Sequence, residues 1–425
     1  MAGSTLLTRT FAALERAGVA CCVLRDADRL DEFAAEGGEL DLLVESRQAG
    51  LLRRTLGELG FVALPSWGHA PHRFFLAYDP EGHVWLKLDV VTRIVYGGQW
   101  PTDLGETCLS RRRRVGEAYA PAPEDELISL LLHAVLDKGR IAPHRQRRLR
   151  ALREAVTDPT HMTGLLRRYW SPEMDWPTLS ALLERGDWDA LLAQRPVVTA
   201  HLARRAPLAA RLSGVRRRFE RVFGRLLDLL RAPALPAVAL LGPDGAGKSS
   251  LTEQLRAQFP LPVMSVYMGL YQKGGTRHSR LDRLPGARFA RLVLTQWRRY
   301  VRARLAQARG SLVLFDRYPY DALLNTGEVR SPLKRMRRWL LARACPPPDL
   351  VLVLDAPAQT LYARKGEHSP EALEQQRQAY RALAGRLPRA RLIDTSDDLA
   401  QSARQASAAL WEAMQARHGL LRRGA

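Results

Sequence analysis

The chain has 425 residues, of which 46% are hydrophobic and 26% are charged. That length exceeds one ordinary core, and that composition excludes wholesale disorder, collagen-like repeats and mucin-like stalks, so we expect a multidomain α/β globular protein. The chain has 65 Lys and Arg against 44 Asp and Glu, a formal net charge of +21, and only six of these cations are lysine. Codon bias toward arginine and an anionic partner are both open explanations of this charge.

Two features predict a cytoplasmic location. No apolar run reaches the roughly 18 to 20 residues that cross a bilayer, and residues 1–5 lack a basic segment followed by an apolar one. The cysteines have neither metal-ligand nor disulfide-framework spacing, so we expect reduced thiols at Cys21, Cys22, Cys108 and Cys345.

Residues 1–115 predict a small α/β domain. An amphipathic helix opens it, and apolar runs predict strands at 19–24, 40–44, 74–78 and 84–91. A further helix near 51–59 ends at Gly60. Residues 116–194 have helical periodicity without a convincing strand, so a helical domain is expected there.

Residues 195–235 predict a basic amphipathic connector, in which apolar positions at alternating spacings of four and three indicate one helix over 201–231. This helix either packs on the protein's own domains or lies on an anionic membrane. Residues 277–309 are also basic, with ten Arg against one acid. From 236 to 425 strands alternate with helices, which predicts a parallel sheet with helices on both faces.

A phosphate-binding loop is predicted at residues 242–250, which read GPDGAGKSS. They match G-x-x-x-x-G-K-[ST], after an apolar strand and before a helix. The glycines let backbone N–H groups surround phosphate oxygens, Lys248 would reach the β- and γ-phosphates, and Ser249 would ligate Mg²⁺. The expected ATP-binding residues are Gly242, Asp244, Gly245, Gly247, Lys248, Ser249 and Ser250.

Chemistry-bearing residues follow later strands. The apolar run 312–315 ends in Asp316 and Arg317, where open α/β sheets bind ligands. A second run, 350–354, ends in Asp355, and the charged stretch 361–368 precedes a helix from Pro370.

The ordered segments GPDGAGKSS, FDRYPYD, PPPDLVLVLDAP, ARKGE and LIDTS resemble the thymidylate kinase family of P-loop nucleoside monophosphate kinases, over about residues 236–415. The resemblance implies that Arg317 holds the acceptor phosphate, that Asp316 helps organise the site and that Asp244 faces the acceptor sugar. It also implies a lid at 362–380, with Arg364 and Lys365 closing on the transferring phosphoryl group. Some family members carry an arginine where this chain has Gly245, so the lid would supply the cation here.

The acceptor itself stays open. Thymidylate kinases usually place Arg-Glu-Pro after the second strand, whereas this chain reads SVYMGLYQ at 265–272. The acceptor is thymidylate, another nucleotide, or a metabolite that is not a nucleotide.

Three carboxylates are predicted to converge in the first domain. Glu39 and Asp41 share one face of a strand, and Asp89 lies on a later strand. Such a set would hold the Mg²⁺ ions of a nucleotidyl transfer. The arrangement resembles the minimal nucleotidyltransferases of the polymerase-β type, over about residues 5–190. His133 and Asp137, one helical turn apart, are either a ligand pair or a structural pair.

We therefore expect an ATP- and Mg²⁺-dependent phosphotransferase of thymidylate kinase type, fused behind a nucleotidyltransferase-like domain. One alternative is a nucleotidyltransferase acting through Glu39, Asp41 and Asp89, whose P-loop half only binds nucleotide. Another is a kinase of a non-nucleotide metabolite, and a non-catalytic option is a membrane- or nucleic-acid-associated protein gated by ATP. The expected partner is a nucleotide or another anionic small molecule, with no sequence-specific nucleic acid. A homodimer and peripheral membrane contact through the basic segments are open.

Overall fold

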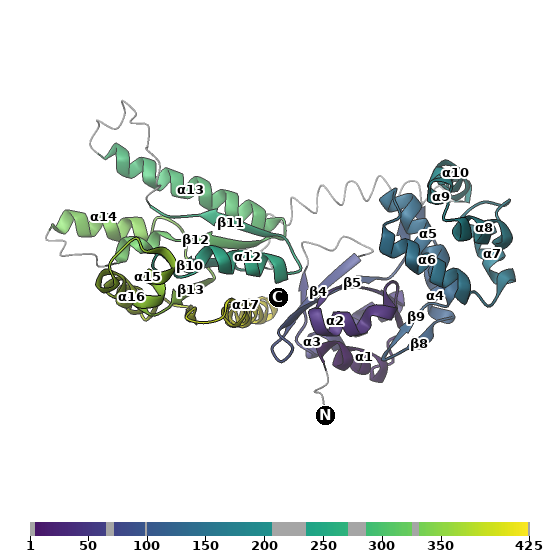
Figure 1. The fold of residues 1–425 in the computed structure, drawn as a ribbon, viewed down its shortest axis with the longest axis horizontal. Coiled ribbons are helices and arrows are strands. Elements are labelled where there is room, and N and C mark those ends of the chain that lie inside the picture. Colours follow the sequence, from purple (N-terminus) through teal and green to yellow (C-terminus); the bar gives the residue numbers. More distant parts are fainter. Residues whose placement is uncertain are drawn as a thin grey trace. The chain divides into compact units, whose positions relative to one another are not determined.

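The computed structural model describes residues 5–64, 72–97, 100–205, 235–270, 286–324 and 331–423. The chain forms two compact units, Met1–Gly224 and Arg225–Ala425, whose elements are labelled in Figure 1. The boundaries expected at 115, 194 and 235 stay predictions. The helix predicted over 201–231 is described only at its start, inside α10, and the rest of it lies outside the described residues.

The first unit contains a sheet and a set of helices. Its strands are β1 (Cys21–Val23), β2 (Gly38–Val44), β3 (Val62–Leu64), β4 (His72–Asp79), β5 (Val84–Val91), β6 (Val95–Tyr96), β7 (Trp100–Pro101), β8 (Arg113–Val115) and β9 (Ala118–Ala120). Its helices are α1 (Leu6–Arg16), α2 (Leu30–Glu36), α3 (Ala49–Glu58), α4 (Leu104–Ser110), α5 (Pro123–Leu132), α6 (Pro143–Ala155), α7 (Pro159–Tyr169), α8 (Trp176–Arg185), α9 (Trp188–Ala193) and α10 (Arg195–Arg205), with 3-10 turns η1 (Ala27–Arg29) and η2 (Ser46–Gln48) and the π-helical turn η3 (His133–Lys138).

The five-stranded sheet of this unit is mixed, in the order β1-β2-β5-β4-β3. Strands β2 and β5 are parallel, with Asp41 opposite Asp89, and the other pairs are antiparallel. The strands expected at 19–24, 40–44, 74–78 and 84–91 are confirmed as β1, β2, β4 and β5. The short strands β3 and β6 to β9 were not predicted, because two or three residues carry too little periodicity.

The helical segment after α4 shares a core with the sheet. Cys22 and Leu43 of the sheet belong to the same buried cluster as Leu131 of α5 and Trp170, which follows α7. The helices expected over 116–194 are present from Pro123 onward, but strand β9 (Ala118–Ala120) lies at the start of this range, so the expectation of a stretch without a strand is wrong there. Sheet and helices are therefore held together by one apolar interior.

The second unit alternates strands and helices, as expected. Its strands are β10 (Ala237–Leu241), β11 (Val263–Tyr267), β12 (Leu312–Asp316), β13 (Leu350–Asp355) and β14 (Ala390–Asp394). Its helices are α12 (Lys248–Gln258), α13 (Ala287–Ala308), the 3-10 helix η5 (Pro319–Leu323), α14 (Pro332–Ala342), α15 (Ala358–Lys365), α16 (Pro370–Ala384) and α17 (Leu399–Arg423).

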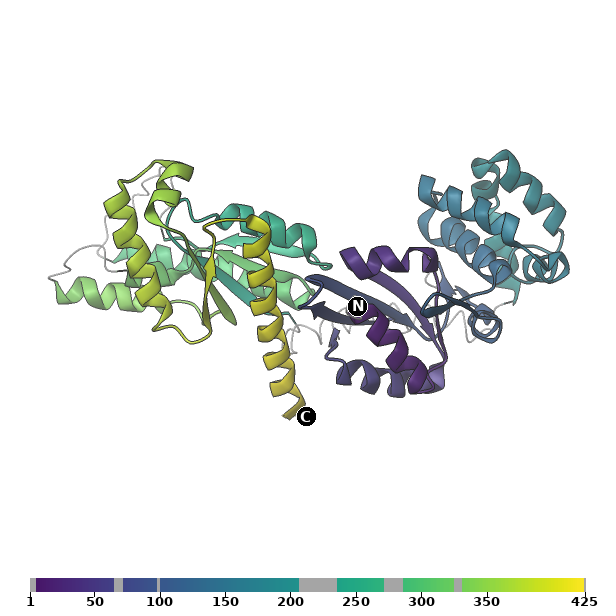
Figure 2. The ribbon, with the colours of Figure 1, turned by 60° about the horizontal axis from the view of Figure 1, so that its bottom comes forward.

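The second sheet has the order β11-β12-β10-β13-β14, and every pair is parallel. Helix α13 packs on β11 and β12, while α16 and α17 pack on β13 and β14, and Figure 2 shows α17 as a long helix beside the sheet. Leu240 of β10 is opposite Asp316 of β12, so the loop after β10 and the residues after β12 meet at one sheet edge. That edge is where ligands of open α/β folds bind.

Candidate functional site

The loop between β10 and α12 has the backbone that phosphate binding requires. Gly245 and Gly247 have φ values of 86° and 85°, in the region that favours glycine, and Lys248 begins α12 directly after Gly247. The N–H groups at the start of α12 therefore face the loop, where they and the helix dipole attract anions. Ser249 and Ser250, the next two residues, are exposed.

Gly245 is in close contact with α15, at the residue just before the predicted lid. A Cβ at this position would lie 2.7 Å from the carbonyl oxygen of Leu361 in α15. Together with the positive φ, this contact excludes any side chain at position 245. The absence of a P-loop arginine therefore has a steric cause in this chain.

Lys248 is folded against its own loop. Its Nζ donates to the carbonyl oxygens of Gly242 (2.9 Å) and Pro243 (2.8 Å). Burial, and then the nearby Arg317, lower the pKa of Lys248 to about 8. The cost of holding this ammonium would be offset by an anionic ligand, which is what the β- and γ-phosphates of ATP supply.

Arg317 adopts a left-handed backbone conformation, with φ of 63°, immediately after β12. Such a conformation costs a non-glycine residue energy and occurs mainly where function requires it. Its Nη2 donates to Asp244 Oδ1 at 2.6 Å, and its Nη1 lies 3.6 Å from Asp321 Oδ2. The strained backbone thus aims the guanidinium at the P-loop.

Asp321 and Tyr380 complete this side of the site. The Tyr380 hydroxyl donates to Asp321 Oδ1 at 3.2 Å. Burial raises the pKa of Asp321, and Arg317 opposes that shift. The two residues come from η5 and α16, so two separate elements hold the partner of Arg317 in place.

The two predicted lid cations have different surroundings. Lys365 Nζ lies 3.7 Å from Asp244 Oδ1 and 3.3 Å from Glu367 Oε2. The exposed Arg364 donates from Nη2 to the carbonyl oxygen of Ser396 at 3.3 Å. The structure thus brings Lys365, and not Arg364, to the P-loop.

Asp316 and Asp355 end β12 and β13, the two strands that flank β10 in the second sheet. Asp355 binds two arginines of α16, Arg377 at 2.8 Å and Arg381 at 2.7 Å. Asp316 accepts from the N–H of Met268 through its backbone carbonyl, at 2.9 Å, and its negative charge opposes the lowering of the Lys248 pKa.

Residues 237–401 match the family model of an AAA domain. The second unit therefore contains an AAA-type P-loop domain, and the match runs from β10 past β14. A solved structure, thymidylate kinase from Candida albicans, is similar over 44% of this chain and 94% of its own, at 16% identity and a TM-score of 0.31. No curated protein matches the chain.

The AAA-type P-loop domain fits ATP and Mg²⁺ by its donor set. The space beside Gly247 is open, since a Cβ at this position would have no heavy atom within 4 Å. Lys248 supplies a desolvated cation, and the exposed Ser249 supplies a hydroxyl where Mg²⁺ would be held.

The three predicted carboxylates of the first unit do come together. One oxygen of each of Glu39, Asp41 and Asp89 lies within 4.8 Å of the others. Each carboxylate, however, already has a basic side chain as partner: Lys87 lies 3.0 Å from Glu39, Arg25 lies 3.1 Å from Asp41 and His72 lies 2.9 Å from Asp89. A divalent ion at this cluster would compete with the ion pairs of Lys87 and Arg25 and with the contact of His72.

The pair His133 and Asp137 belongs to the same network. Their side chains are 2.9 Å apart, Arg25 Nη1 lies 3.2 Å from His133 Nε2, and Asp137 accepts from the N–H of Gly97. Burial lowers the pKa of His133, whereas the hydrogen bond with Asp89 raises the pKa of His72. These contacts give the His133 and Asp137 pair a structural role toward Arg25.

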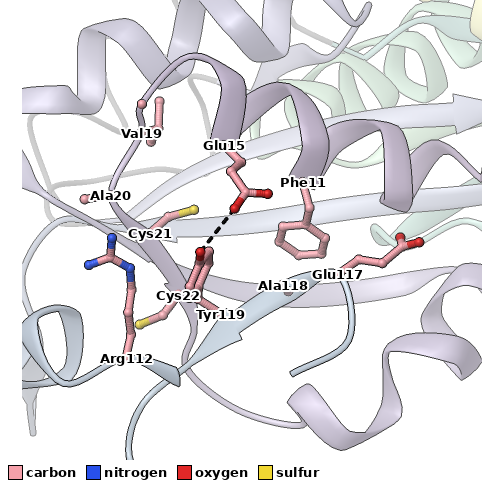
Figure 3. A pocket seen from close by; sticks show the side chains of 11 residues that line it. Phe11, Glu15, Val19, Ala20, Cys21, Cys22, Arg112, Glu117, Ala118 and Tyr119 are labelled. Carbon is pink, nitrogen blue, oxygen red and sulfur yellow. Dashed lines mark hydrogen bonds between the residues drawn. The ribbon is translucent and has the colours of Figure 1, made fainter. Parts of the chain in front are cut away.

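A small cavity of about 150 Å³ lies elsewhere in the first unit, between α1, β1 and the hairpin β8–β9 (Figure 3). Glu15 accepts there from the Tyr119 hydroxyl at 3.1 Å. Burial raises the pKa of the Cys21 thiol to about 11, so this thiol is protonated near neutral pH and a poor nucleophile. All four cysteines are free and buried, in agreement with the expectation of reduced thiols.

Sequence reasoning missed several residues of both sites, namely Asp321, Tyr380, Arg25, His72 and Lys87. Asp321 stands in the quoted FDRYPYD segment and was within reach, because i and i+4 positions meet on a helical turn. Lys87 and Asp89 are two residues apart on one strand, so their side chains share one face of the sheet. Nothing in the sequence marks Tyr380 or His72.

Proposed function

We propose that the AAA-type P-loop domain is an ATP- and Mg²⁺-dependent phosphotransferase that moves the γ-phosphoryl group to an anionic small molecule, dTMP or a related phosphorylated acceptor. One observation carries the proposal: cations from three separate segments, Lys248, Arg317 and Lys365, surround Asp244. A module that only binds nucleotide needs the P-loop lysine alone, whereas phosphoryl transfer needs charge neutralised on both donor and acceptor.

Each residue then has a distinct role. Lys248 and the N–H groups at the start of α12 hold the donor phosphates, and Ser249 holds the Mg²⁺ ion that neutralises them. Arg317 exchanges its contact with Asp244 for the acceptor anion, since both are oxygen acceptors for one guanidinium. Lys365 stands on the lid helix, within reach of the moving group, and Asp316 helps order the sheet edge.

The decisive experiment is product analysis with Mg-ATP and a panel of acceptors that includes nucleoside monophosphates and phosphorylated metabolites. ADP formation that depends on one acceptor supports the proposal. Pyrophosphate release without ADP would instead assign the chemistry to the first unit. ATP binding without either product would make the second unit a binding module and contradict the proposal.

Arg317→Ala is expected to raise the acceptor KM by roughly 10- to 150-fold, because a hydrogen bond to a charged group contributes about 1.5–3 kcal/mol. The ATP KM should change little. Arg391→Ala, on the exposed side of β14, is the matched control. Steady-state kinetics in both substrates make the measurement, and an unchanged acceptor KM in a folded variant would remove Arg317 from the site.

A second candidate function, nucleotidyl transfer by the first unit, is favoured by the convergence of Glu39, Asp41 and Asp89. Asp41→Asn combined with Asp89→Asn should then eliminate Mg²⁺-dependent pyrophosphate release and leave ADP formation unchanged. Pyrophosphate release that survives the double substitution would show that these acids are structural. If wild-type protein releases no pyrophosphate with any acceptor, Arg25, Lys87 and His72 occupy the place that metal ions would take beside the three carboxylates.

A further inference from the structure

Helix α13 turns Ala303 and two glutamines toward the core. Gln296 and Gln307 are almost fully buried. They donate to the carbonyl oxygens of Gly269 (3.3 Å) and Leu235 (2.6 Å). Four apolar side chains of this helix are nevertheless between 41% and 53% exposed: Leu294, Trp297, Val301 and Leu305. Their spacing of three, four and four places them in an arc of about 80° on one face.

Helix α14 has an even larger uncovered apolar face. All its residues are described, and only Ala342 is buried. Its apolar side chains Leu333, Met336, Trp339 and Leu340 are 40–53% exposed. They occupy an arc of about 120°. An isolated helix of this length is marginal in water, so an apolar face that no described residue covers indicates a partner.

The charge on both helices is of one sign. Neither α13 nor α14 contains Asp or Glu, while α13 has six Arg and α14 has three Arg and one Lys. On α13, Arg298 and Arg302 are exposed beside the apolar arc. On α14 the cations fill the helix surface outside its apolar arc. The partner must therefore offer negative charge next to an apolar interior.

We infer that α13 and α14 dock on the surface of an anionic phospholipid bilayer. Helices with Lys and Arg on one face and Trp and Leu on the other lie in the interface plane, with the apolar side in the acyl boundary. A second copy of this chain would bring cations against cations, and a nucleic acid has no apolar interior for Leu and Val. None of the helices that the structure describes has the length and apolarity to cross a bilayer, so this contact is peripheral.

The docking surface is close to the proposed acceptor site within the same unit. Helix α14 packs on η5, and Asp321 of η5 pairs with Arg317. Figure 1 shows α13 and α14 extending toward the same end of the second unit. The inference does not rest on the proposed function, because the two apolar faces and their charge are independent of the P-loop.

Co-sedimentation of the full chain with vesicles tests the inference. Binding is expected to vesicles of phosphatidylcholine with phosphatidylglycerol, weakly or not at all to phosphatidylcholine alone, and less at high salt. Leu333→Gln with Trp339→Gln, and separately Trp297→Gln with Val301→Gln, should each lower the partition coefficient at least about tenfold. Leu392→Gln, an exposed apolar residue on β14, is the matched control and should bind as wild type.

Other outcomes would overturn the inference. The inference is wrong if wild-type protein does not sediment with anionic vesicles. It is also wrong if the α13 and α14 variants bind these vesicles as well as wild type does. A dimer in light scattering that these variants dissociate, without vesicle binding, would assign the surface to a second copy. Thermal unfolding like that of wild type shows that the variants are folded. The double variant Arg335→Gln with Arg337→Gln removes two positive charges from α14 and leaves its apolar face unchanged, so it tests the contribution of charge to vesicle binding.

Discussion

Lys248→Ala is expected to abolish ADP-forming turnover while the protein stays folded. Within the described part of the chain, the Lys248 side chain donates its hydrogen bonds to the carbonyl oxygens of Gly242 and Pro243, in its own loop. Its removal therefore breaks no hydrogen bond between separate elements. What is lost is the cation between the β- and γ-phosphates, whose charge stabilisation increases in the transition state. We expect kcat to fall by at least about two orders of magnitude.

The matched control is Arg256→Ala, which removes an exposed cation from the same helix. It should leave kcat and the ATP KM unchanged. Coupled ADP detection gives the rate, and thermal unfolding shows whether both variants are folded. Turnover at the wild-type rate in a folded Lys248→Ala protein would contradict the assignment of the P-loop as the donor site.

The P-loop could be predicted because its function depends on backbone conformation that few residues allow. Gly245 and Gly247 do have positive φ values, and the strand before them and the helix after them are where the spacing put them. Asp316, Arg317 and Asp355 could be placed at one edge because parallel strands end together. These inferences use only local rules and the geometry of a parallel sheet.

Pairing between side chains could not be predicted in the same way. Three carboxylates on β2 and β5 converge as expected, yet Arg25, Lys87 and His72 neutralise them. Arg25 lies beyond the end of β1 and His72 at the start of β4, so their meeting depends on strand order and not on spacing. Nor does the sequence of α13 show that Leu294, Trp297, Val301 and Leu305 are exposed while Gln296 and Gln307 are buried.

The close approach of α15 to the P-loop also needs three-dimensional packing. Gly245 touches the backbone of Leu361, and four residues further along the chain Lys365 ends α15 close to Asp244. Because four residues complete about one helical turn, the contact at Leu361 fixes where Lys365 lies. Arg364, the neighbouring residue, is turned by about 100° around the helix and reaches Ser396 instead.

This difference leads to a prediction that separates the two lid cations. Lys365→Ala should lower kcat by at least about 100-fold with little change in ATP affinity, because the charge it neutralises develops chiefly in the transition state. Arg364→Ala, one residue away and equally charged, should stay within about threefold of wild type. Single-turnover ADP formation, with ATP binding measured separately, distinguishes the two.

If Arg364→Ala caused the larger loss of kcat, α15 would have to rotate when the site closes on its substrates. Gly245 would then lose its contact with Leu361. A Gly245→Ala protein, whose Cβ blocks the present packing, should in that case keep more activity than Lys365→Ala. If α15 holds its position, Gly245→Ala should be as impaired as Lys365→Ala, because the displaced helix carries Lys365 away from Asp244.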